Sequence, residues 1–96
     1  MKIVINRSFG MFSIPEAFFK KLGITNEDDK WNFEGSLETR TDTRLIELVE
    51  KEGYEAPDLA VVEIPDESTD WEIGEYDGKE WVIYVLDGKI RRGVIE

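Results

Sequence analysis

Residues 71–90, WEIGEYDGKEWVIYVLDGKI, specify the architecture of the C-terminal part of this chain. It contains two Asp-Gly pairs, at 77–78 and 87–88, and each pair lies between strand-forming residues. Asp-Gly in this context is a strong hairpin signal, because a type I′ turn requires positive φ at both central residues. Two such turns in one run predict a three-stranded antiparallel meander.

The middle strand of this meander, residues 80–86, is apolar from Trp81 onward, which is typical of a strand that is covered on both faces. We therefore expect Trp81 and Ile83 to lie beneath helices. A two-residue turn at 77–78 also sets the register, and it places Glu75 directly opposite Glu80. Two opposed carboxylates repel each other. Either both are screened at a solvated hairpin tip, or they are retained to bind a basic partner.

Two further strands are predicted, at residues 2–6 (KIVIN) and 59–64 (LAVVEI). Helical sequence lies between them, so we expect the two strands to be parallel neighbours joined by a right-handed crossover. The residues Trp31-Asn32-Phe33 are interpreted as a short edge strand.

Two helices are predicted before the strand at 59–64. Ser13 and Glu16 fit a capping box, which begins a helix that ends at Gly23. The second helix covers residues 42–52 and is capped by Thr41 or Asp42, and its buried stripe is Leu45, Leu48 and Val49. These elements predict one α+β domain over residues 1–96, with a mixed sheet that ends in the meander and two helices packed on one face.

The composition argues against an enzyme. The chain has no cysteine and no histidine, so the commonest general base and the commonest transition-metal ligands are missing. The serines, lysines and carboxylates follow no catalytic spacing, so we expect no catalytic residue, no bound metal and no cofactor. No apolar run approaches the roughly 18 residues of a membrane span, and the N-terminus is too polar for a signal peptide. We expect a cytoplasmic protein.

The net charge of −10 is concentrated in one segment of the chain. Residues 50–80 contain twelve acidic residues and two lysines, whereas the charges of all other residues sum to zero. A sequence pI near 4.4 opposes the phosphate neutralisation on which nucleic-acid binding depends. The segment therefore predicts a negative surface that attracts a basic partner, or a charge that serves solubility.

Several motifs carry a resemblance to a known family. They are KIVINRSFGMFSI at 2–14, RTD at 40–42, VVEIPD at 61–66 and W-x-I-x-EYDG-x-EW at 71–81. Together they resemble a family of small uncharacterised phage and bacterial proteins that open with a KIVIN-type strand. Met11 stands where that family usually has a second glycine, and the lengths differ over residues 24–38. The resemblance implies a phage or mobile-element setting and adds no catalytic residue.

The functional hypothesis is a small acidic protein-binding module of phage type. It would inhibit a host defence or nucleic-acid-handling protein by presenting a partly nucleic-acid-mimicking surface to that protein's basic groove. Carboxylates on one face of a strand repeat at about 6.6 Å, comparable to phosphates along a single strand. The predicted partner-binding residues are Glu67, Asp70, Glu72, Glu75, Asp77 and Glu80. The alternative is a structural or housekeeping interaction module whose acidity only keeps it soluble. Neither hypothesis involves direct binding to nucleic acid or membrane.

Overall fold

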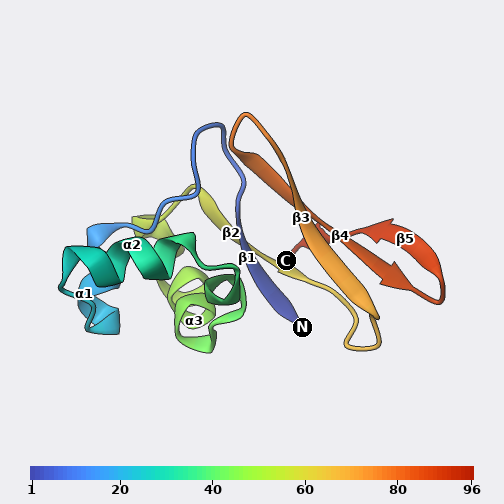
Figure 1. The fold of residues 1–96 in the computed structure, drawn as a ribbon, viewed down its shortest axis with the longest axis horizontal. Coiled ribbons are helices and arrows are strands. Elements are labelled where there is room, and N and C mark those ends of the chain that lie inside the picture. The colour runs from blue at the N-terminus through green and yellow to red at the C-terminus, as the bar shows by residue number, and fades with distance from the viewer.

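The structure is a computed structural model that describes all 96 residues, and it has three layers. Helices form the first layer, a sheet of β1, β2 and β6 the second, and a sheet of β3, β4 and β5 the third (Figure 1). The elements are β1 (Lys2–Asn6), α1 (Glu16–Leu22), α2 (Glu27–Gly35), the 3₁₀ turn η1 (Leu37–Thr41), α3 (Thr43–Glu52), the 3₁₀ turn η2 (Gly53–Glu55), β2 (Leu59–Glu63), β3 (Asp70–Tyr76), β4 (Lys79–Leu86), β5 (Lys89–Arg92) and β6 (Val94–Ile95). The predicted α+β class is confirmed.

The strands β1 and β2 form the centre of the molecule and are antiparallel, so the predicted parallel pairing is wrong. The reason lies where the chain enters β2. The backbone N–H of Arg7, just after β1, donates to the carbonyl of Asp58, just before β2, at 2.8 Å. The Arg7 side chain donates to the Pro57 carbonyl at 3.0 Å. The chain thus returns to the end at which β1 finished, and β2 must run in the opposite direction.

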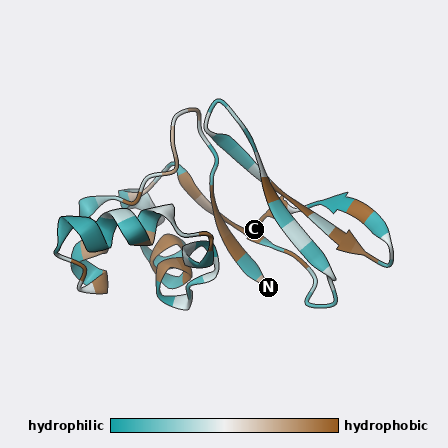
Figure 2. Ribbon diagram, viewed as in Figure 1, coloured by the Kyte–Doolittle hydropathy of each residue, from teal (hydrophilic) through white to brown (hydrophobic).

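Because side chains alternate along a strand, the central layer supplies two separate cores. Val4 and Val61 point toward the helices and pack with Phe18 and Leu45, all of them almost fully buried. Residues of the opposite face point toward the second sheet; they are Ile3, Ile5, Ala60, Val62 and Ile64. This explains why both strands are hydrophobic on both faces, as the colouring of β1 and β2 in Figure 2 shows.

The helical layer contains three helices rather than the two predicted. The segment predicted as an edge strand around Trp31 is part of α2, which begins where the Asn26 side chain accepts hydrogen bonds from the backbone N–H groups of Asp28 and Asp29. The predicted Ser13 cap is wrong, because α1 begins after Pro15 without a side-chain cap. Helix α1 does end at Gly23, which has φ 75°.

Helix α3 agrees closely with the prediction. Asp42 is its N-cap and accepts hydrogen bonds from the backbone N–H groups of Arg44 and Leu45. Leu45 and Val49 are buried as expected, while Leu48 is only half-buried. Ile46, which the prediction omitted, is buried instead.

The meander is confirmed as a separate sheet, with β4 between β3 and β5. Both Asp-Gly turns have positive φ at both residues, 53° and 90° at the first and 53° and 73° at the second. The single mixed sheet was wrong, because Pro65 has no N–H to continue a ladder and the chain turns there, with Ser68 N–H donating to the Pro65 carbonyl. Residues 70–92 then form a new layer.

The orientation of β4 was also predicted incorrectly. Val82 is fully buried against the central sheet, together with the half-buried Trp71, Ile73 and Tyr84. Because side chains alternate along a strand, Trp81 and Ile83 point to the side opposite to Val82. This side faces away from the central sheet and from the helices beyond it. Both remain half-buried within their own sheet.

Candidate binding groove

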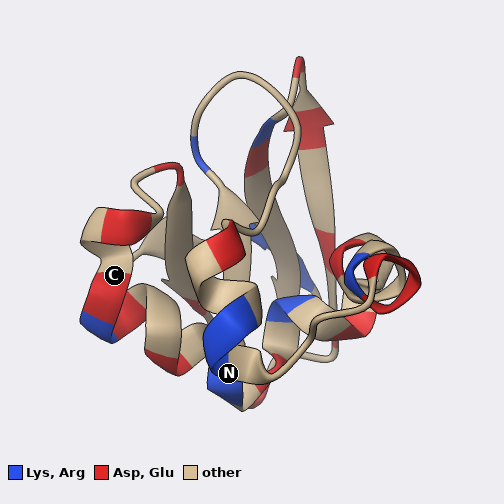
Figure 3. Cartoon of the chain, turned by 90° about the vertical axis from the view of Figure 1, so that its left-hand side faces the viewer, with Lys and Arg blue, Asp and Glu red and all other residues tan.

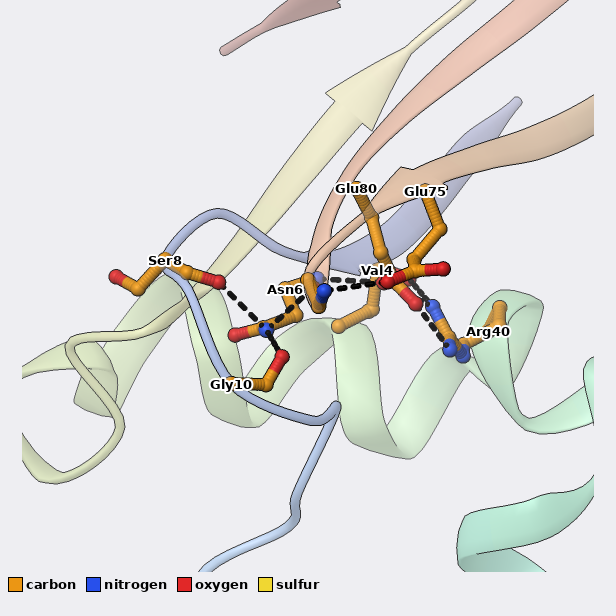
Figure 4. A network of polar contacts seen from close by, with 8 residues as sticks. Val4, Asn6, Ser8, Gly10, Arg40, Glu75 and Glu80 are labelled. Atoms are coloured by element: carbon orange, nitrogen blue, oxygen red, sulfur yellow. Dashed lines mark hydrogen bonds and ion pairs between the residues drawn. The ribbon is translucent and has the colours of Figure 1, made fainter.

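A buried ion pair joins the helical layer to the second sheet. Nη1 and Nη2 of Arg40, in η1, donate to the two carboxylate oxygens of Glu80, in β4, at 2.7 and 2.9 Å. Only 12% of the Arg40 side chain and 8% of the Glu80 side chain are exposed. The Asn6 backbone N–H donates to Glu80 at 2.8 Å, and Arg40 also donates to the Val4 carbonyl (Figure 4). These additional bonds satisfy polar atoms that burial would otherwise leave unpaired.

The side chain of Asn6 fixes the loop that follows β1, residues 7–13. Asn6 is 2% exposed, and its amide nitrogen lies within donating distance of the carbonyls of Ser8 (2.9 Å), Gly10 (3.1 Å) and Gly78 (2.7 Å). The Gly10 N–H donates to the Asp77 carbonyl at 3.0 Å. The loop is therefore docked onto the β3–β4 turn, which is distant from it in sequence.

The contact between Gly10 and Gly78 leaves no room for a side chain. A Cβ atom added to Gly78 would lie 1.2 Å from the Gly10 carbonyl oxygen. At the other end of the loop, the Arg40 guanidinium lies 3.6 Å from the centre of the Phe12 ring, a close cation–π stack. The loop is thus held at both ends by interactions with buried groups.

Between this loop, α2 and the β3–β4 turn lies a groove of about 690 Å³. The groove is lined by Gly10, Met11, Phe12, Trp31, Glu34, Gly35, Arg40, Glu75, Asp77, Gly78 and Glu80. Arg40 and Glu80 neutralise each other, so the three other carboxylates give the groove a net charge of −3. Met11 and Trp31 are 87% and 80% exposed, an unusual exposure for such large apolar side chains.

The carboxylates of the groove are held in place and can still accept hydrogen bonds. Glu34 accepts the backbone N–H of Ile14 at 2.9 Å, and Glu75 accepts the backbone N–H of Gly78. A carboxylate has about four acceptor positions, so both retain free lone pairs. Asp77 is exposed in the turn itself. The groove can therefore receive a cationic group and surround its stem with apolar surface.

The six predicted partner-binding residues do not form one surface. Glu75, Asp77 and Glu80 line the groove. Asp70 and Glu72 lie at the other end of β3, on the face opposite to Glu75. Glu67 is exposed in the loop before β3.

The Glu75–Glu80 register is confirmed, but both interpretations of the pair need correction. Glu80 is neither solvated at the hairpin tip nor free for a partner, because its carboxylate is buried against Arg40. Only Glu75 remains exposed.

The groove also includes residues outside the predicted partner-binding set, among them Met11, Trp31, Glu34 and Arg40. The positions of Trp31 and Glu34 depend on α2. A signal for that helix was present, since Asn26 is a favoured N-cap residue and three acidic residues follow it in the first turn. The pairing of Arg40 with Glu80 had no local signal.

Other acidic residues of the segment 50–80 are paired near the helices. Glu50 binds Lys2, and both Glu52 and Glu55 bind Lys21. The hydrogen bond to Glu50 raises the pKa of Lys2, and the hydrogen bond to Glu52 is the chief cause that raises the pKa of Lys21. Acidic and basic residues are interspersed on the helices in Figure 3. The acidic residues of segment 50–80 therefore do not form one continuous negative surface.

Comparison with protein-family models, with curated proteins and with solved structures finds no match to this chain. No cluster of three or more Asp, Glu, His or Cys side chains is arranged to hold a metal ion. No helix is both long enough and apolar enough to cross a membrane.

Proposed function

We propose that this protein is a non-enzymatic binding module that takes a basic segment of a partner protein into the groove. The observation that carries the proposal is the combination of three uncompensated carboxylates with the exposed Met11 and Trp31 on one preorganised concave surface. A surface held in place before binding loses less conformational entropy on association.

The chemistry of the groove suits an arginine or lysine side chain. A guanidinium group forms paired hydrogen bonds with carboxylates such as Glu34 and Glu75, and it stacks on the face of an indole such as that of Trp31. The aliphatic stem of either residue would cover the exposed Met11. Phosphates of nucleic acid or of a membrane surface would be repelled by the same carboxylates.

The resemblance to phage proteins supports a particular kind of partner. Under this proposal the partner is a host protein, in the host cytoplasm, that handles nucleic acid through a basic surface segment, and the module inhibits it by binding that segment. Charge attraction would speed the encounter, and the groove would give specificity. In the alternative, the protein is a structural interaction module whose acidity serves solubility, an idea favoured by the wide distribution of Glu50, Glu52, Glu55 and Glu67.

A matched pair of triple variants distinguishes these possibilities. The first replaces the groove carboxylates (Glu34→Gln, Glu75→Gln, Asp77→Asn), and the control replaces three exposed carboxylates outside it (Glu67→Gln, Asp70→Asn, Glu72→Gln). Both variants lose three negative charges, and Gln and Asn retain a hydrogen-bond acceptor. The readout is fluorescence anisotropy of a labelled oligo-arginine peptide, measured in dilute buffer and in about 0.15 M salt.

We expect the groove variant to bind the peptide about tenfold or more weakly than the parent. The control should lose only the small contribution of long-range electrostatic attraction to the affinity. Trp31→Ala should weaken binding without changing the charge. Equal weakening by both triple variants would show that only net charge matters, and the groove proposal would then fail. The host partner itself can be sought by capture from host lysate with the parent protein and the groove variant in parallel.

A further inference from the structure

The face of the second sheet that points away from the rest of the molecule is uncovered. All three helices lie beyond the central sheet, so no helix packs on this outer face (Figure 1), and at its edge Lys79 lies 5.7 Å from the centre of the Phe9 ring. The strand pairings assign its residues, because directly opposed residues share a face. We define the outer face as Asp70, Glu72, Gly74 and Tyr76 of β3, Lys79, Trp81, Ile83 and Val85 of β4, and Ile90 and Arg92 of β5.

The centre of the outer face is hydrophobic. Trp81, Ile83 and Val85 follow one another along β4, and Ile90 beside them is 78% exposed. The Trp81 indole lies across Gly74, where an added Cβ would approach its Nε1 to 2.3 Å. The Arg92 guanidinium lies 5.2 Å from the indole. A contiguous apolar stripe bordered by charges is the pattern of a protein–protein contact surface.

The charges of the outer face balance, in contrast to those of the whole protein. Asp70 and Glu72 lie on it with Lys79 and Arg92, so its net charge is zero, whereas the chain carries −10. Two copies of a strongly acidic protein repel each other over most of their surface. On the outer face that repulsion is absent, because its two acidic and two basic residues balance. The outer face is therefore best suited to bind another surface with the same balance of charges.

The arrangement of the charges is complementary to itself. Glu72, Ile83 and Arg92 form one row across β3, β4 and β5. If a second copy is related by a two-fold axis parallel to β4, its β5 lies over β3 of the first. Glu72 then meets Arg92 of the second copy on both sides of an Ile83–Ile83 contact. An axis perpendicular to the strands would instead place β3 over β3, with like charges opposed.

We infer that the outer face binds a second copy of this chain as a two-fold symmetric dimer with its axis parallel to β4. Two sheets that pack face to face lie about 10 Å apart and are rotated by about 30°, which keeps the central row in contact. The contact is isologous, so each stabilising pair occurs twice. It involves only three strands, and a small interface predicts a dimer that dissociates on dilution.

Charge reversal tests this geometry directly. Glu72→Arg alone and Arg92→Glu alone each place like charges together in a homodimer, so both variants should be monomeric where the parent associates. A mixture of the two variants restores both opposite-charge pairs and should form a heterodimer. The matched control is Arg91→Glu, which changes the charge on the same strand at a position on its other face. On its own this control should associate like the parent, and mixing it with Glu72→Arg should not rescue the association of Glu72→Arg.

The measurement is sedimentation equilibrium of the full chain up to about 1 mM protein. We expect each single reversal to weaken association by about tenfold or more, and the mixture to return it to within about threefold of the parent. A parent that stays monomeric, or a mixture no tighter than its components, overturns the proposal. If a variant does not fold, amide NMR of the parent on dilution decides. Changes confined to the outer face support the dimer, and their absence or their appearance elsewhere refutes it.

Discussion

Replacing Gly78 with alanine is expected to destabilise the protein much more than the same replacement at Gly88, although both glycines follow an aspartate in equivalent turns. The two aspartates share φ 53°, and the glycines have φ 90° and 73°. Alanine must adopt positive φ at either position, at a cost of about 1–2 kcal/mol. This contribution is common to both variants, so their difference isolates the tertiary contact.

That difference can be worked out from the surroundings of each glycine. A Cβ at Gly88 meets nothing within 4 Å, whereas one at Gly78 lies 1.2 Å from the Gly10 carbonyl oxygen. Relieving this overlap moves the loop and breaks the bonds from Asn6 to the Gly78 carbonyl and from Gly10 to the Asp77 carbonyl. The Asn6 amide is buried, so the loss of its hydrogen bond costs about 1–3 kcal/mol, whereas Gly10 and Asp77 are exposed and water can replace their bond. We expect a total of about 2–5 kcal/mol for Gly78→Ala and about 1–2 kcal/mol for Gly88→Ala.

The assay is urea denaturation followed by circular dichroism, with the m-value checked for each variant so that the free energies are comparable. The oligo-arginine peptide provides a second readout, because Gly78→Ala displaces one wall of the groove and Gly88→Ala does not. Free energies of unfolding that differ by less than about 1 kcal/mol between the two variants would contradict a tight contact between Gly78 and Gly10. In that case the loop would not be held by the turn, and the groove would not be preorganised.

Three other predictions concern the ion pair, a helix cap and the net charge. Arg40→Met or Glu80→Gln alone leaves a buried charge unpaired and should lower the free energy of unfolding by about 3–5 kcal/mol. In urea melts the double variant should be more stable than the sum of the two single losses predicts, by about 2 kcal/mol or more. Strictly additive losses would contradict the pairing. Asp42→Ala should cost about 1 kcal/mol at neutral pH by removing the α3 cap. The hydrogen bond from Arg44 and those of the cap lower the pKa of Asp42 from its usual 3.8. The stabilisation is therefore complete at pH values above 3.8, the pKa in the unfolded chain, and is lost as the pH falls through the lowered pKa of the folded protein. Asp42→Asn keeps the cap and should flatten the acid limb of a stability–pH curve, and an unchanged limb would argue against the assignment. Raising NaCl to about 0.15 M should increase Tm, because it screens unpaired carboxylates beyond roughly 8 Å. A flat or falling Tm in calorimetry would show that ion pairs such as that of Lys21 with Glu52 dominate instead.

Three of the eleven residues that line the groove, Glu75, Asp77 and Glu80, could be predicted from sequence. The Asp-Gly turn at 77–78 placed Glu75 opposite Glu80 correctly, because hairpin register is set within a few residues. The rest of the groove comes from α2 and from the loop after β1. The partner of Glu80 is 40 positions away, and no local pattern relates Arg40 to it. The opposed glutamates therefore suggested repulsion, whereas burial with Arg40 makes Glu80 part of the scaffold.

Local sequence accounts for the features that depend on neighbouring residues. These are the two type I′ turns, the start of α3 after a cap at Thr41 or Asp42, the end of α1 at Gly23 and the hydrophobic strands predicted at 2–6 and 59–64. The turns and helix ends follow from backbone sterics or from a hydrogen bond spanning two to four residues, and the strands follow from their apolar runs.

Long-range contacts set the direction of β2, the division into two sheets and the outward orientation of Trp81. An apolar run shows that a strand has a hydrophobic environment, but it does not show which layer covers which face. In β1 and β2 both faces are covered, by helices and by the second sheet, whereas in β4 only the Val82 face is covered. The layers are chosen by the free energy of burying all apolar surface together, and that quantity depends on residues distant along the chain.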